Sequence, residues 1–67
     1  MNKLICYCVA GTLIDSGDSH EWYFDRLAEL NKFFDRYDDL IYNVQLWEVR
    51  IEYGTHRCLW NKLNQLP

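Results

Sequence analysis

The feature that most constrains the fold is an alternation of residue types that ends at a turn. It sets Glu48, Arg50 and Glu52 against Trp47, Val49, Ile51 and Tyr53, which is typical of a strand with one buried face. Gly54-Thr55 follows and fits a two-residue type II′ turn, because glycine can take the positive φ that the first turn position requires. We therefore predict a β-hairpin with strands at about 43–53 and 56–62.

The register of this hairpin follows from pairing Tyr53 with His56. Glu52 then faces Arg57, Ile51 faces Cys58, Val49 faces Trp60 and Glu48 faces Asn61. One face carries Trp47, Val49, Ile51, Tyr53, Cys58 and Trp60, and the other carries Glu48, Arg50, Glu52, Arg57 and Leu59. Two alternatives stay open: Leu59, Leu63 and Leu66 also fit a helix, and residues 40–46 fit either a continued strand or a bulged segment.

The first segment, about residues 2–13, is rich in β-forming residues and is apolar on both faces. Leu4, Cys6, Cys8 and Ala10 lie on one face, and Ile5, Tyr7, Val9 and Leu13 on the other. A strand of this kind needs cover on both sides. If its small side chains face the helix, the Ile5 side is left outward.

A helix is predicted over about residues 19–37. Residues 15–19 are a turn-forming stretch. Within it, Asp18, with Glu21 three positions later, resembles a capping box. The expected buried stripe consists of Trp22, Tyr23, Leu27, Leu30, Phe33, Phe34 and Tyr37. A short loop is expected at Asp38-Asp39.

These elements give a single α+β domain, residues 1–67, in the order β-α-β-β. One amphipathic helix packs on a three-stranded, mostly antiparallel sheet. Because the last two strands are hairpin neighbours, the first strand is expected at an edge, beside the last strand. An edge strand with an apolar outer face is usually covered.

Charge and cysteine content limit the function classes. The net charge is -3, and no block of lysines or arginines is present to neutralise phosphates, which makes nucleic acid an unlikely partner. The chain has three cysteines, whereas a secreted disulfide framework usually has an even number of four or more, so we expect a cytoplasmic protein. No apolar run is long enough to span a membrane. Lys3 and residues 4–14 also have the form of a short secretory segment, but no clean cleavage site follows.

Chemistry-bearing residues are few. One alternative function is a zinc- or thiol-dependent small protein that uses Cys6, Cys8, Cys58 and His56. Alternate strand residues, however, place side chains parallel rather than converging, which is unfavourable for a zinc site. We expect no metal, no cofactor, no catalytic residues and no enzymatic activity. A further alternative is an acidic mimic of nucleic acid that uses Asp15, Asp18, Glu21, Asp25, Asp35, Asp38 and Asp39.

The remaining feature is apolar surface that would be costly to leave in water. We expect a partner-binding patch formed by Ile5, Tyr7, Val9, Phe24 and Leu59. Cover by residues 40–46 or by the C-terminal tail is the alternative. The expected function is a small protein-binding protein that acts as an inhibitor, adaptor or dimerising regulator, with a protein partner or a second copy bound through the first strand. Compact regulators and phage-type accessory proteins are often short acidic chains of this kind.

Overall fold

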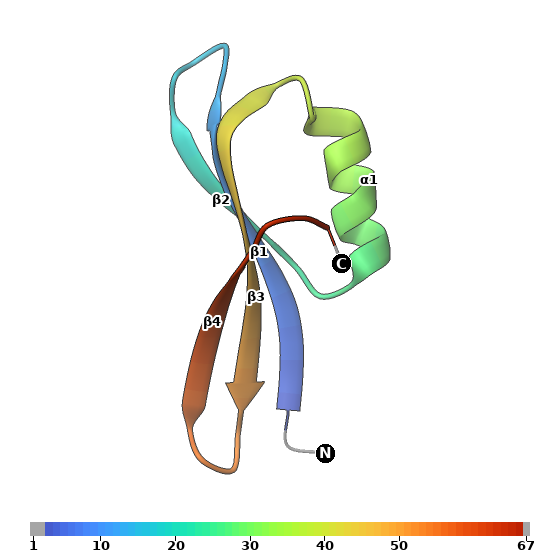
Figure 1. The fold of residues 1–67 in the computed structure, drawn as a ribbon. Helices are drawn as coiled ribbons and strands as arrows, with labels where there is room; N and C mark the ends of the chain where they lie inside the picture. The colour runs from blue at the N-terminus through green and yellow to red at the C-terminus, as the bar shows by residue number, and fades with distance from the viewer. Residues whose placement is uncertain (1–2, 67) are drawn as a thin grey trace.

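The computed structural model describes residues 3–66. Its elements are β1 (Lys3–Leu13), β2 (Ser19–Phe24), α1 (Leu27–Tyr37), β3 (Ile41–Glu52) and β4 (Arg57–Leu63). The four strands form one antiparallel sheet in the order β2-β1-β3-β4, and α1 lies against one face of it (Figure 1). The fold is therefore α+β, as predicted, but the sheet has a fourth strand and the element order is β-β-α-β-β.

The additional strand comes from the first third of the predicted helix. Residues 19–24 pair with β1, for example Trp22 with Val9 and Phe24 with Tyr7, and α1 begins only at Leu27. Trp22 and Phe24 favour strands as much as helices, and alternate residues of this segment can share one face of a sheet. The predicted start of the helix was wrong because the 19–24 segment satisfies both periodicities.

The turn-forming stretch closes the β1–β2 hairpin instead of capping a helix. The Leu13 amide donates to the Asp18 carbonyl at 2.9 Å, and the Gly17 amide donates to the Leu13 carbonyl at 2.8 Å. Gly17 has a φ of 74°, a conformation that glycine adopts without a Cβ clash. The polar residues make a turn, as predicted, but the capping box does not form.

The position of β1 was also predicted incorrectly. It lies in the centre of the sheet, between β2 and β3, rather than at an edge beside the last strand. A central strand has a neighbouring strand on each side, and the β1–β2 turn brings β2 to the second side of β1. Beyond the pair of Tyr7 with Phe24, residues 3–6 of β1 have no partner in β2.

The β3–β4 hairpin confirms the predicted register. Glu52 pairs with Arg57, Ile51 with Cys58, Val49 with Trp60 and Glu48 with Asn61, so residues 57–63 form a strand and not a helix. The turn differs from the prediction. It spans residues 53–56, and its positive φ, 54°, lies at His56. A longer turn leaves Tyr53 and His56 outside the ladder.

Residues 41–46 belong to β3, with an irregularity that explains their ambiguous pattern. The register between β1 and β3 shifts between Ala10 and Thr12, and Asn43 has a φ of 53°. An extra residue at such a bulge reverses the alternation beyond it. Ile41 and Leu46 are an odd number of positions apart, yet both lie in the core.

The core lies between α1 and the sheet. Its buried members are Val9, Leu30, Phe33, Ile41 and Leu46. Phe33 is the centre of an aromatic cluster, with ring centroids 4.9 Å from Trp22 and 5.1 Å from Phe24. The Asp38 amide donates to the Phe34 carbonyl at the end of α1, and the loop that follows confirms the break predicted at Asp38-Asp39.

The helix covers only part of the sheet (Figure 1). We call β2, α1 and residues 7–13 and 41–46 the helix-covered half. The hairpin half consists of residues 3–6, 47–52 and 57–62, and it extends beyond the helix. This arrangement makes the molecule elongated, with extents of 42 × 21 × 18 Å. Among residues 3–66, no helix is long and apolar enough to cross a membrane.

Candidate functional site: the open face of the sheet

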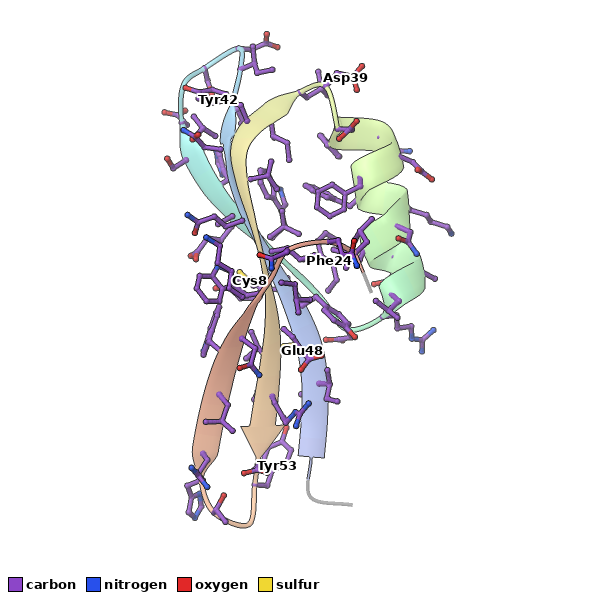
Figure 2. The ribbon with its side chains drawn as sticks, viewed as in Figure 1. Cys8, Phe24, Asp39, Tyr42, Glu48 and Tyr53 are labelled. Carbon is purple, nitrogen blue, oxygen red and sulfur yellow. The ribbon has the colours of Figure 1, made fainter. Side chains whose placement is uncertain are left out.

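The side of the sheet away from α1, which we call the open face, has apolar residues on all four strands. Register places the members of each row side by side. One row is Tyr23, Cys8, Trp47 and Lys62; the next is Cys6, Val49 and Trp60; the third is Leu4, Ile51 and Cys58. Cys8 lies on this side of the sheet, opposite to Phe24, in Figure 2. Seven of these ten residues lie on the hairpin half and have a hydrocarbon, aromatic or thiol side chain.

Burial on the open face comes from neighbouring side chains. Cys8 and Val49 are buried, at 0% and 4% exposure, although α1 packs on the opposite face. Trp47 and Trp60 approach edge to face with ring centroids 6.3 Å apart. These large rings flank Val49, so the face has a dry centre and an aromatic rim.

The rim of the open face remains accessible to solvent. Trp60 is 45% exposed, Leu4 40% and Tyr23 58%. No described residue packs over them as a further layer. An exposed, mainly apolar surface of this kind is typical of a contact site in a small protein.

Two thiols of the open face, those of Cys6 and Cys8, have raised pKa values that favour their neutral form. Burial raises the pKa of the Cys8 thiol, an effect that a hydrogen bond with Tyr23 partly opposes. Burial also raises the pKa of the Cys6 thiol, and the negative charge of Asp25 adds to this increase. A nucleophilic or metal-binding cysteine needs the opposite shift, because the thiolate is the reactive species. The two thiols therefore act as apolar surface at neutral pH.

The four residues considered as zinc ligands are not gathered into one group. Cys6 and Cys58 lie on β1 and β4, with β3 between them, and His56 lies in the turn. Within residues 3–66, no group of three or more histidine, cysteine or acidic side chains could hold a metal.

The five residues of the predicted patch share the helix side of the sheet, so the predicted assignment of the two faces of β1 was reversed. Val9 is fully buried beneath α1, and Tyr7 and Phe24 pack against the core. Phe24 also lines a shallow groove beside α1 with Phe33 and Tyr37. Val9 is bulkier than Cys8 and packs against the aromatic face of the helix, while Cys8 is covered by its neighbours within the sheet.

Ile5 and Leu59 remain exposed on the helix side of the hairpin half, but charged residues separate them. Both pair in register with Arg50, whose Nη2 donates to Glu48 Oε1 at 3.2 Å. The Arg50 Nε is buried and has no hydrogen-bond partner. This side is therefore a less favourable apolar contact surface than the open face.

The sequence contained one unused signal for the correct face. Leu46 and Leu63 lie on the otherwise charged face of the hairpin, next to the buried Val9. Two leucines at one end of a charged face indicate that the helix packs there. That signal would have left Trp47 and Trp60 on the open face.

Acidic residues gather at the end of the molecule opposite to the β3–β4 turn. The Ile14 amide donates to the Leu40 carbonyl at 3.0 Å, which joins the β1–β2 turn to the loop after α1. Asp15 and Asp18 lie in that turn, and Asp38 and Asp39 in that loop; Asp39 is labelled in Figure 2. In contrast, the hairpin half contains Lys3, Arg50, Arg57 and Lys62 against Glu48 and Glu52.

No protein-family model, curated protein or solved structure gives a significant match to this chain.

Proposed function

We propose that this chain is a small, non-enzymatic protein-binding protein whose contact surface is the open face of the sheet. The observation that carries the proposal is the uncovered apolar rim around Val49, in particular Trp60 and Leu4. Desolvating exposed tryptophan and leucine side chains supplies much of the free energy of protein association. An inhibitor, an adaptor or a dimerising regulator would each use such a surface.

Two features support binding over catalysis. Burial raises the pKa values of the Cys6 and Cys8 thiols on this face, so these two thiols lack the activation that a nucleophile needs. The face itself is nearly flat and apolar, which suits a protein surface better than it suits a small substrate that must be enclosed.

Lys62 is a lone cation among the aromatic rings of this face in the described chain, which is too little charge for a nucleic-acid platform.

The test is a binding experiment with matched leucine variants. Leu4 on the open face and Leu27 on α1 are equally exposed, at 40% and 39%. We expect Leu4→Asp to abolish retention of the partner from an extract of the native host, and Leu27→Asp to leave it unchanged. Circular dichroism of both variants checks that the fold is intact. Equal retention by the two variants, or equal loss, would contradict the assignment of the open face.

Salt dependence separates this proposal from the acidic mimic of nucleic acid. Binding through the open face is expected to change little between low and high salt, since apolar contacts are not screened. Binding through Asp15, Asp18, Asp38 and Asp39 would weaken steeply with added salt. A steep loss that Leu4→Asp does not affect would favour the mimic.

A further inference from the structure

The outer edge of β4 is a second candidate contact surface, because no described strand pairs with it. β4 pairs only with β3, and its residues 57–62 are all exposed. The chain then leaves the sheet and crosses toward α1 (Figure 1), so it does not return along this edge. An exposed strand edge presents unpaired amide and carbonyl groups, and another strand can satisfy them.

The charged residues of β4, Arg57 and Lys62, lie toward its two ends. Between them, Cys58-Leu59-Trp60 places apolar side chains on both faces, and the strand contains no proline. The opposite edge strand, β2, is one residue shorter and carries a charged residue, Glu21, at its centre. Edge pairing is therefore favoured at β4 rather than at β2.

We propose that a second copy of this chain pairs with β4 in antiparallel orientation, with Leu59 of the two copies facing each other at the two-fold axis. The product is a continuous eight-stranded sheet. The proposal is independent of the open-face contact, because it rests on backbone edge groups and on the register of one strand.

The register follows from the symmetry of the pair. A two-fold axis perpendicular to the sheet keeps each face on its own side, so each register is centred on one residue. With the axis at Leu59, Cys58 of each copy faces Trp60 of the other copy, and Arg57 faces Asn61. Apolar side chains meet apolar side chains on both faces.

Neighbouring registers are less favourable. An axis at Trp60 places Cys58 opposite Lys62 and Leu59 opposite Asn61, which leaves apolar groups facing polar ones. An axis at Asn61 requires Leu63, which already packs against the core.

The apolar pairs of this register favour a second copy as the occupant. Leu59 meets Leu59 and Cys58 meets Trp60, so the exposed apolar residues of β4 are matched on both faces of the sheet. Cys58 and Trp60 then join the open faces of the two copies into one wider surface.

The first test measures mass in solution. Sedimentation equilibrium up to about 200 μM is expected to show a reversible dimer of the 8.1 kDa chain, with micromolar affinity in keeping with a small interface. Leu59→Lys places like charges at the axis and is expected to weaken the dimer at least about tenfold. Ile14→Lys, in the distant β1–β2 turn, is the control and leaves the dimer unchanged. A monomer at every concentration overturns the proposal.

Charge pairing and disulfide formation test the register. A mixture of Leu59→Lys and Leu59→Glu is expected to form a heterodimer, although each variant alone is a monomer. In a Cys6→Ser, Cys58→Ser background, Leu59→Cys is expected to form an intermolecular disulfide faster than Asn61→Cys. Faster coupling at Asn61 overturns the Leu59 axis. Leu4→Asp leaves the dimer intact, so failure of the open-face proposal and failure of this one give different results.

Discussion

The helix-covered half and the hairpin half use similar side chains for opposite purposes. In the helix-covered half, Trp22 packs its ring 4.9 Å from Phe33 beneath α1. In the hairpin half, Trp60 packs against Trp47 at 6.3 Å, with no further layer over it in the described chain, and stays half exposed. The buried core cluster lies in the helix-covered half, so we expect that half to supply most of the stability, and the exposed rings of the hairpin half form the surface that we propose for partner contacts.

The largest expected difference between the halves lies in their leucines. Leu30→Ala removes a fully buried side chain from the core and is expected to lower the free energy of unfolding by about 3 kcal/mol. Leu59→Ala, at an exposed site of the hairpin half, is expected to cost less than about 1 kcal/mol. Urea denaturation measures both. Equal costs would mean that the hairpin half contributes a core of its own.

A tryptophan pair sharpens the same comparison. Trp22→Ala is expected to cost about 2–3 kcal/mol, because it opens the aromatic cluster around Phe33. Trp60→Ala is expected to cost about 1 kcal/mol and to abolish partner binding. Thermal unfolding and the host-extract binding assay are the two measurements. Retained binding by Trp60→Ala would remove the open face as the contact surface.

The two turns differ in how they accommodate a positive φ. Gly17 supplies it in the β1–β2 turn, whereas His56 supplies it in the β3–β4 turn. Gly17→Ala is expected to destabilise the protein by about 1 kcal/mol, and His56→Gly to stabilise it by a similar or smaller amount. Gly11→Ala is the control, since an added Cβ there would make only ordinary contacts of 3.5–3.7 Å. Chemical denaturation decides the signs.

The smallest effect concerns the thiols. Because burial raises the pKa of Cys8 above its ordinary value of 9.0, the native state retains a proton that the unfolded state releases. Stability is therefore expected to be complete below about pH 9 and to decrease as the pH rises further. Denaturation at pH 7.5 and 10 measures the decrease. Cys8→Ala is expected to make the slope shallower, and an unchanged slope would contradict the assignment.

Thiol accessibility provides a second readout of the same comparison. Cys58 is exposed on β4, and Cys8 is buried. A thiol reagent is expected to modify Cys58 within the native state, and Cys8 only when the sheet opens. Fast modification of Cys8 would show that the row of Tyr23, Cys8 and Trp47 separates easily.

Several features of the fold follow from local sequence pattern alone. The α+β class, the turn after Leu13, the end of the helix near Asp38 and the register of the β3–β4 hairpin all follow from periodicity and turn chemistry. In the hairpin, one choice of register separates apolar from charged faces, and any slip mixes them.

Only the tertiary structure decided the use of residues 19–24, the central position of β1 and the side of the sheet that α1 covers. The 19–24 segment fits helix and strand equally, and pairing with β1 selects the strand. The irregularity at Asn43 hides the alternation that would have placed Ile41 in the core. Both faces of β1 are apolar, so local pattern cannot choose between Val9 and Cys8. The choice depends on how Leu30 and Phe33 pack against Leu46, which is a contact between distant parts of the chain.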